Sequence, residues 1–246
     1  AQAAERQEKA VNFRITNDAL GTGNAKEKFR ANMDAIRLLH QIEEEGRTTA
    51  TPEEQEVLSH YVGWGGLQEA FEERNEAWAN EFIELYTELD PEEYSAARES
   101  TLSAFYTPPV VIKAMYEALE NMGLEKGNVL EPSCGIGNFL GLVPEGMDSL
   151  KMYGVELDSI SGRIAKLLYP EADFLLDLHG GDWNEELAPL VFFPCGAEQK
   201  LEQETRRAAQ ALSVSMRVCS TAQNGLYSWA AQKGIPALLL ERGGNG

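Results

Sequence analysis

The sequence predicts an α/β protein in which a helical N-terminal region precedes alternating strands and helices. Hydrophobic residues make up 43% of the 246 residues and charged residues 25%, which are ordinary proportions for a globular protein. In the first hundred residues, apolar side chains recur at the three- and four-residue spacing of amphipathic helices. After Thr107-Pro108-Pro109, short apolar runs alternate with helical patterns, as in a parallel sheet that is covered by helices.

Residues 1–100 are expected to form an acidic helical region. Phe29, Met33 and Ile36 follow helical spacing and place apolar side chains on one face. Thr51-Pro52 combines an N-cap residue with proline in the first turn, so a second helix should begin there. The predicted helices of this region span residues 25–45, 51–61, 75–89 and 91–100.

The rest of the chain is expected to contain short strands and helices in turn. The strands are predicted at residues 128–131, 152–156, 173–178, 216–220 and 237–241. The helices are predicted at residues 110–122, 159–168, 197–212 and 227–233. The strand at 173–178 could continue the sheet that the first two strands begin.

The charge of the chain argues against a stand-alone nucleic-acid-binding protein. The net charge is −19, and residues 173–246 contribute −3 (six Lys or Arg against nine Asp or Glu), which leaves −16 on the first 172 residues. Because Lys and Arg hold the phosphates of nucleic acids, a DNA partner would require additional domains or a local basic patch. No run of eighteen apolar residues and no signal peptide is present in this sequence, so we expect a cytoplasmic protein with no membrane partner.

The three cysteines and the chain ends lead to two further expectations. Cys134, Cys195 and Cys219 are too few and too scattered for a disulfide framework or a four-cysteine zinc site, so we expect reduced thiols. The chain begins with Ala1 and ends at Gly246 directly after a short glycine-rich run, so both ends look cut from a longer chain. Nothing in the sequence indicates the oligomeric state.

A glycine loop after the predicted strand at 128–131 is the strongest sign of a ligand site. The run from Glu131 through Pro132-Ser133-Cys134-Gly135-Ile136-Gly137-Asn138-Phe139 places small residues where a strand turns and a ligand can approach the backbone. Some nineteen residues beyond Gly137, Glu156 stands at the end of the next predicted strand, where a carboxylate can accept hydrogen bonds from ribose hydroxyls. The pair predicts a nucleoside cofactor.

These residues resemble motif I of the S-adenosylmethionine-dependent adenine-N6 DNA methyltransferases. Phe105-Tyr106-Thr107-Pro108-Pro109 resembles the element that precedes motif I in that family, and residues 11–172, with Tyr61-Val62-Gly63-Trp64-Gly65-Gly66, are similar to the methylase region of large methylase-helicase proteins of bacterial mobile elements. The resemblance implies a doubly wound, Rossmann-like sheet, S-adenosylmethionine as cofactor and DNA as substrate. For Trp64 we expect packing at a helix end rather than DNA contact.

The resemblance also implies roles for individual residues. Glu131, Gly135 and Gly137 would line the methionine part of the cofactor, Glu156 would hold the ribose, and Tyr106 with Thr107 would close the site. The candidate cofactor-binding residues are therefore Tyr106, Thr107, Glu131, Pro132, Gly135, Gly137, Asn138, Phe139 and Glu156. The family also needs Asn or Asp followed by Pro-Pro and an aromatic residue to hold the acceptor adenine, and this sequence does not contain it. A module that binds the cofactor without turnover therefore stays open as an alternative.

Residues 173–246 carry a second resemblance, to the zinc-dependent succinylglutamate desuccinylase and aspartoacylase family. It lies in Asp173 to Asp182 and in Gly234 to Glu241, and it implies His179 as a zinc ligand and Glu241 as general base. A catalytic zinc usually has three protein ligands, and the family's His-x-x-Glu pair appears only as His40-Gln41-Ile42-Glu43, inside a predicted helix.

Two partial catalytic sets in one chain predict a chimera. A methyltransferase-like segment at 101–172 would be joined to a zinc-hydrolase-like fragment at 173–246, behind the helical region 1–100. If the chain is an enzyme, an adenine-specific DNA methyltransferase is the first expectation and a zinc-dependent amidohydrolase the alternative.

Overall fold

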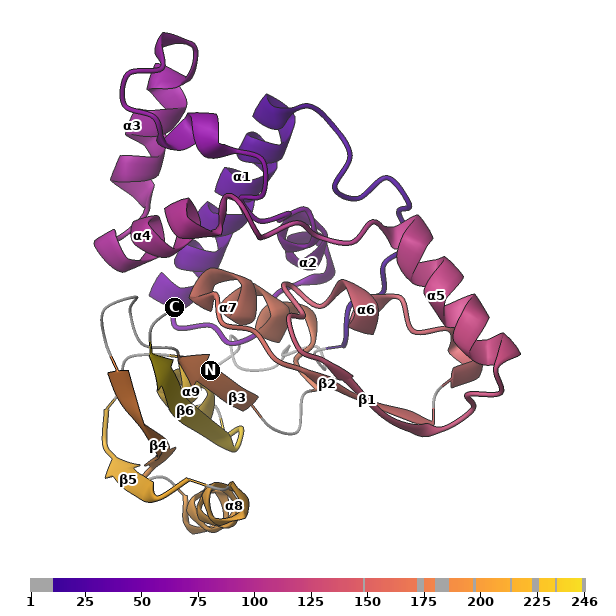
Figure 1. Ribbon diagram of the computed structural model, residues 1–246, viewed down its shortest axis with the longest axis vertical. Helices are drawn as coiled ribbons and strands as arrows, with labels where there is room; N and C mark the ends of the chain where they lie inside the picture. Colours follow the sequence, from indigo (N-terminus) through magenta and orange to yellow (C-terminus); the bar gives the residue numbers. More distant parts are fainter. Residues whose placement is uncertain are drawn as a thin grey trace, which may run out of the picture. The chain divides into compact units, whose positions relative to one another are not determined.

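A computed structural model shows two compact units (Figure 1). It describes residues 11–147, 149–171, 175–179, 186–196, 198–212, 214–222, 226–232 and 234–244. Unit 1 contains the described residues up to Gly154 together with Asp158–Glu171, and unit 2 contains Val155–Leu157 and the described residues from Leu175 onward. Across these ranges, no helix is long and apolar enough to cross a membrane.

The first part of unit 1 is helical, and local capping interactions explain where its helices begin. The side chains of Asn24, Thr51 and Asp90 each accept a hydrogen bond from the backbone three residues later, where a glutamate returns the bond. The predicted helix at 75–89 is divided, because a 3-10 turn precedes the α-helix. The elements are α1 (Ala25–Glu44), α2 (Pro52–Ser59), η1 (Gln68–Phe71), η2 (Glu76–Trp78), α3 (Ala79–Glu88) and α4 (Pro91–Ser100).

The second part of unit 1 contains a two-stranded parallel sheet. The strands pair in the register Val129↔Met152. The second strand ends at Gly154, so Glu156 follows it by two residues and does not end it as predicted. The elements are α5 (Pro109–Asn121), β1 (Gly127–Glu131), α6 (Asn138–Gly141), η3 (Glu145–Met147), β2 (Leu150–Gly154) and α7 (Ser159–Leu168).

Helices from both parts of unit 1 share one hydrophobic core. Phe29 and Met33 of α1 pack with Trp64 and with Ile164 of α7 in a single buried cluster. Trp64 is 1% exposed, and its ring lies 5.4 Å from the ring of Phe71 in an edge-to-face arrangement. The expectation that Trp64 is a packing residue is confirmed.

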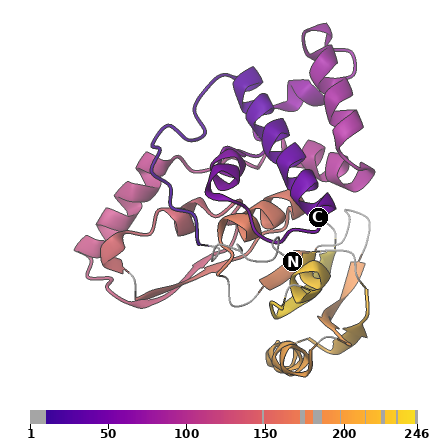
Figure 2. The same cartoon turned by 180° about the vertical axis from the view of Figure 1, so that it is seen from behind.

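Unit 2 is built on a four-stranded mixed sheet in the order β3-β6-β4-β5. Its inner pair, β4 and β6, is antiparallel, whereas both outer pairs are parallel. α8 and α9 cover opposite faces, because alternate residues of β4 pack in different clusters: Val191 and Phe193 with Ala209 of α8, and Phe192 with Ala230 of α9 (Figure 2). The elements are β3 (Leu175–His179), β4 (Glu186–Pro194), α8 (Gln199–Ala211), β5 (Met216–Ser220), α9 (Leu226–Gln232) and β6 (Ala237–Gly244).

Three expectations are corrected in unit 2. β3 pairs with β6 and not with the β1–β2 sheet, while Asp173 and Phe174 of the predicted strand lie outside the described residues. No strand was predicted at the residues that form β4, and in the structure Pro189 lies at the register shift between Leu187 and Leu190, where a proline is tolerated in a sheet. Neighbouring strands β4 and β5 bring the Cα atoms of Cys195 and Cys219 to 5.6 Å from each other, and the two cysteines form a disulfide, whereas Cys134 forms none.

Candidate cofactor site

The loop between β1 and α6 turns through two glycines with left-handed backbone. Gly135 has φ 56° and Gly137 has φ 90°, a conformation that side chains with a Cβ rarely adopt. The amide of Gly137 donates to the Cys134 carbonyl over 2.8 Å, and Gly137 caps α6. A Cβ at Gly137 would lie 2.4 Å from the Tyr169 ring, so the loop requires glycine there for backbone conformation and for space.

Tyr106 lies against the same loop and is held by α7. A Cβ at Gly135 would lie 2.8 Å from Cζ of Tyr106, so the tyrosine ring uses the space that glycine leaves. The Tyr106 hydroxyl lies 2.8 Å from Oγ of Ser161. The Ser161 amide in turn donates to the carboxylate of Asp158, the N-cap of α7, over 2.8 Å. Tyr106 therefore connects the glycine loop to the first turn of α7.

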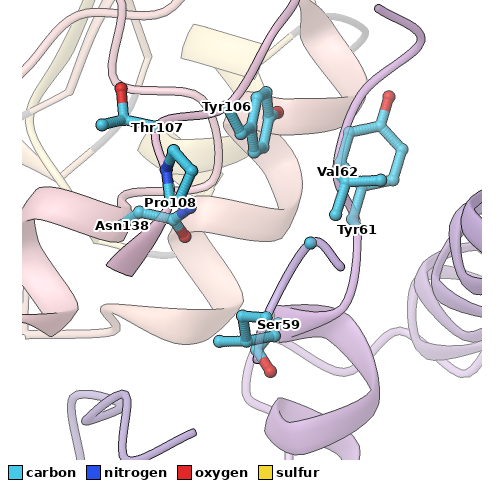
Figure 3. Close-up of a pocket in the computed structure, with 9 residues that line it drawn as sticks. Ser59, Tyr61, Val62, Tyr106, Thr107, Pro108 and Asn138 are labelled. Atoms are coloured by element: carbon cyan, nitrogen blue, oxygen red, sulfur yellow. The ribbon is translucent and has the colours of Figure 1, made fainter. Parts of the chain in front are cut away.

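Two pockets adjoin the segment that contains Tyr106. The first, here called the loop pocket, has an empty volume of about 320 Å³. The second, the tyrosine pocket, has an empty volume of about 290 Å³ (Figure 3). The loop pocket is lined by Phe105, Tyr106, Thr107, Glu131, Ser133, Cys134, Gly135, Asn138 and Phe139. The tyrosine pocket is lined by Leu20, Gly21, Ser59, Tyr61, Val62, Tyr106, Thr107, Pro108 and Asn138. The pockets share Tyr106, Thr107 and Asn138.

The structure brings most of the sequence-predicted cofactor residues to the loop pocket. Those that line it are Tyr106, Thr107, Glu131, Gly135, Asn138 and Phe139. Pro132 is exposed beside it, and Gly137 is buried against Tyr169. Glu156 belongs to unit 2, where its carboxylate accepts a hydrogen bond from the Leu157 amide over 2.9 Å.

Glu131 supplies the negative charge of the loop pocket. Its side chain is half-buried at the end of β1. Burial, and in addition the charge of Glu131, raise the pKa of Tyr116 to about 12. The Tyr116 hydroxyl donates to the Phe139 carbonyl over 2.8 Å and supports the far wall of the pocket. The pocket thus pairs one carboxylate with the aromatic rings of Phe105, Tyr106 and Phe139.

Ser59, Tyr61 and Val62 are not among the predicted site residues, although the Tyr61–Gly66 motif is visible in the sequence. Their place in the tyrosine pocket depends on a contact between loops that are forty residues apart in sequence. The Tyr61 ring lies 6.2 Å from the Tyr106 ring, and burial raises the pKa of its phenol far above the ordinary value.

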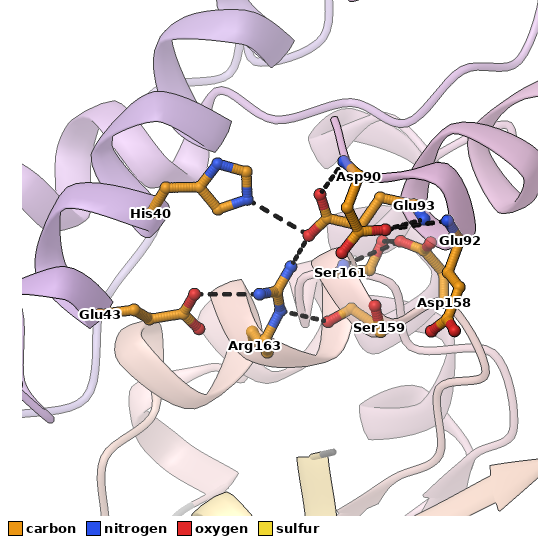
Figure 4. A network of polar contacts seen from close by, with 9 residues as sticks. All are labelled: His40, Glu43, Asp90, Glu92, Glu93, Asp158, Ser159, Ser161 and Arg163. Carbon is orange, nitrogen blue, oxygen red and sulfur yellow. Dashed lines mark hydrogen bonds and ion pairs between the residues drawn. The ribbon is translucent and has the colours of Figure 1, made fainter. Parts of the chain in front are cut away.

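His40 and Glu43, which carry the letters of a His-x-x-Glu pair, belong to a charge cluster between α1, α4 and α7 (Figure 4). His40 Nε2 lies 3.2 Å from Glu93 Oε1, and Arg163 Nη1 donates to Glu43 over 2.9 Å. Arg163 also pairs with Glu93. Burial alone would raise the pKa of Glu93, but the His40 hydrogen bond and the Arg163 charge outweigh it and hold the pKa at about 2. The hydrogen bond with Glu93 raises the pKa of His40, whereas burial raises the pKa of Glu43.

Glu93 in this cluster predicts a loss of stability in acid. Because the pKa of Glu93 is about 2 in the folded chain against 4.5 for an unperturbed glutamate, its contribution is complete above about pH 4.5 and is lost as pH falls towards 2. His40 acts with the opposite sign: its contribution is complete below its unperturbed pKa of 6.5 and is lost as pH rises through the raised value. Urea unfolding at pH 7, 4.5 and 3 should show the acid loss. In Glu93→Gln the free energy of unfolding should fall less steeply between pH 4.5 and pH 3. An unchanged pH dependence would contradict the role given to Glu93.

Unit 2 places the two predicted hydrolase residues side by side. His179 and Glu241 are register partners on the parallel strands β3 and β6. The side chain of His179 lies outside the description, and no group of three or more His, Cys, Asp or Glu that could hold a metal occurs among the residues described. The zinc site at His179 and Glu241 therefore stays a prediction, and a catalytic zinc there would need three protein ligands.

The chain is similar over part of its length to a known phage protein. No protein-family model matches the chain, and no solved structure matches it. Over 151 residues, 61% of this chain, the sequence is 29% identical to Defense against restriction protein B of Escherichia phage P1. The aligned stretch covers 5% of the length of that phage protein. The chain is thus similar to a short part of a much larger protein that is named for defence against restriction.

Proposed function

We propose that unit 1 binds S-adenosylmethionine as the cofactor module of an adenine-N6 DNA methyltransferase, and does not methylate DNA by itself. The observation that carries the proposal is the loop pocket, where Tyr106 and Thr107 meet Glu131, Gly135 and Asn138 from a second, separate motif. The β1–β2 pair would be the beginning of a doubly wound, Rossmann-like sheet. The Asn/Asp-Pro-Pro-aromatic element that holds the acceptor adenine would come from another segment or chain.

The chemistry of the loop pocket fits the methionine end of this cofactor. The Glu131 carboxylate offers an opposite charge to an ammonium group, and aromatic rings such as those of Phe105 and Phe139 attract a sulfonium cation. The loop pocket is small and open on one side, so it would hold one end of the cofactor rather than the whole molecule. When bound, the cofactor supplies an electrophilic methyl group. Tyr106, held by Ser161, would orient the bound end.

A role in DNA modification would agree with the name of the similar phage protein, although that name specifies no activity. Methylation of a base within a target sequence is the chemistry that protects DNA from a restriction endonuclease, and the phage protein's name refers to defence against restriction. The charge of −16 on the first 172 residues means that DNA would be held mainly by other, basic domains. Cofactor binding and DNA binding would thus belong to different parts of a larger assembly.

The test is calorimetric titration of the chain with S-adenosylmethionine. We expect saturable binding that Glu131→Gln weakens about tenfold, because the amide keeps the shape but removes one partner of a half-buried charge pair. Glu125→Gln, at an exposed glutamate just before β1, is the matched control and should leave the affinity unchanged. Glu156→Ala on the same chain reports whether the unit 2 carboxylate takes part.

The absence of binding by a folded sample would reject the proposal. The zinc content of the same sample distinguishes the two interpretations. Stoichiometric zinc would favour the zinc-dependent amidohydrolase interpretation of residues 173–246. Equal weakening by Glu131→Gln and Glu125→Gln would place the cofactor outside the loop pocket.

A further inference from the structure

The outer face of α3 presents large apolar side chains to solvent. Ile83 is 63% exposed and Tyr86 is 71% exposed, and their spacing of three residues makes them neighbours on one face of the helix. A surface helix ordinarily carries polar residues on the side that faces away from the core. Figure 1 shows α3 at the end of unit 1 opposite to β1 and β2, so the proposed cofactor site gives this face no role.

A series of aromatic rings connects the exposed face to the core and holds Tyr86 in place. The Tyr86 ring stacks on the Phe82 ring, with centroids 6.5 Å apart, and meets the Tyr94 ring of α4 edge to face at 5.8 Å. The Tyr94 ring in turn lies 5.5 Å from the ring of Phe71, which is buried. A ring that is already held by its neighbours loses little freedom when a partner binds. Ile83, Tyr86 and Tyr94 are here called the aromatic surface.

The stretch that carries the aromatic surface is strongly acidic. Residues 68–100 contain eleven Asp or Glu against two Arg, a net charge of −9, which is nearly half of the −19 of the whole chain. Exposed glutamates of this stretch that form no ion pair with another described residue include Glu69, Glu72, Glu73, Glu76 and Glu92. A partner with the opposite charge would be attracted to this end of unit 1.

One of these glutamates acts directly on the aromatic surface. Burial raises the pKa of Tyr94, and the charges of Arg98 and Glu73 act on the same phenol in opposite directions. Both charged groups therefore lie near the Tyr94 ring. The exposed ring of Tyr86 and the carboxylate of Glu73 flank one tyrosine, so a single bound side chain could reach a ring face and a carboxylate together.

The same acidic stretch already binds two cations of α1 on its inner side. Lys26 Nζ lies 3.9 Å from the centroid of the Trp78 ring and pairs with Glu81 over 2.6 Å. Arg37 pairs with two further glutamates of α3. A ring face beside a carboxylate is a combination that holds a cation by two attractions at once. The aromatic surface presents that combination to solvent.

We infer that the aromatic surface docks an arginine-rich segment of a partner protein. A guanidinium group stacks on aromatic rings and pairs with carboxylates, so arginine suits this surface better than lysine does. Ile83 would cover the apolar stems of the bound side chains. The charge of −9 disfavours nucleic acids and anionic membranes, because their phosphates would be repelled. The inference does not depend on S-adenosylmethionine, since no residue of α3 lines the loop pocket.

The experiment titrates the whole chain with octa-arginine, blocked at both ends, in about 0.15 M salt, where distant surface charges are largely screened. We expect saturable binding that Tyr86→Ala weakens about fivefold, the loss of one exposed contact between a cation and a ring. Tyr86→Phe keeps the ring and should keep the affinity. Tyr153→Ala, at a 49% exposed tyrosine of β2, is the matched control and should leave the affinity unchanged. Octa-lysine should bind more weakly than octa-arginine.

Binding of octa-arginine that Tyr86→Ala leaves unchanged would overturn the inference, because the attraction would then come from the net charge alone. Absence of binding by a folded chain, or equal weakening by Tyr86→Ala and Tyr153→Ala, would overturn it too. Should Tyr86→Ala fail to fold by circular dichroism, Ile83→Ser, at a side chain that is 63% exposed, replaces it and should also weaken binding. A chain that binds octa-arginine through Tyr86 but does not bind S-adenosylmethionine would reject the proposed function and retain this inference.

Discussion

Gly137→Ala is expected to destabilise the chain by about 3 kcal/mol, a large effect for one added methyl group. An alanine at φ 90° lies outside the regions that residues with a Cβ prefer, which costs on the order of 1–3 kcal/mol. Its Cβ would also overlap the Tyr169 ring. Tyr169 is 6% exposed and its hydroxyl donates to the Gly137 carbonyl over 2.8 Å, so the ring can retreat only by giving up a buried hydrogen bond.

Urea unfolding followed by tryptophan fluorescence measures this effect. Gly146→Ala is the control, because a Cβ at Gly146 meets nothing within 4 Å, and it should change stability by less than about 0.5 kcal/mol. The folded Gly137→Ala variant should also bind S-adenosylmethionine more weakly in the titration, because the glycine loop forms part of the lining of the loop pocket. Equal stability of the two variants would mean that the loop does not adopt this turn.

Arg163→Met is expected to destabilise the chain by about 3 kcal/mol, because it removes the cation between the buried carboxylate of Glu93 and the half-buried carboxylate of Glu43. Glu93 is 7% exposed and Glu43 is 23% exposed, and Arg163 pairs with both. Removing one partner of a buried ion pair leaves an uncompensated charge and costs about 3–5 kcal/mol. We take the lower value because His40 still contacts Glu93, at 3.2 Å.

The matched control for this prediction is Arg206→Met in unit 2. Arg206 is 51% exposed and pairs with Glu202 one helical turn away, an arrangement worth about 0.3–0.5 kcal/mol. A second variant distinguishes loss of the charge from loss of packing: Glu93→Gln combined with Arg163→Met should recover part of the stability. Equal urea midpoints for Arg163→Met and Arg206→Met would show that the cluster contributes little.

The sequence by itself determined the local elements of this protein. Helices α1, α2 and α4 begin where Asn24, Thr51 and Asp90 cap them, because each cap is satisfied within three residues and needs no distant partner. The bounds of α7 and β5 are those the sequence predicted, since apolar periodicity marks them locally. The glycine loop at 131–139 could be recognised as well, because its turn depends on glycines that are visible in the sequence.

Only the tertiary structure decided which of these elements meet. The Tyr61–Gly66 loop contacts Ala104 and thereby forms one wall of the tyrosine pocket. β3 pairs with β6 in the sheet of unit 2, and the pairing of β4 with β5 places Cys219 beside Cys195. Strand pairing and loop contacts of this kind join residues that are distant along the chain, and their selection depends on how the whole core packs. Local sequence patterns carry little of that information, so most residues of the loop pocket could be named in advance, whereas Ser59, Tyr61 and Val62 of the tyrosine pocket could not.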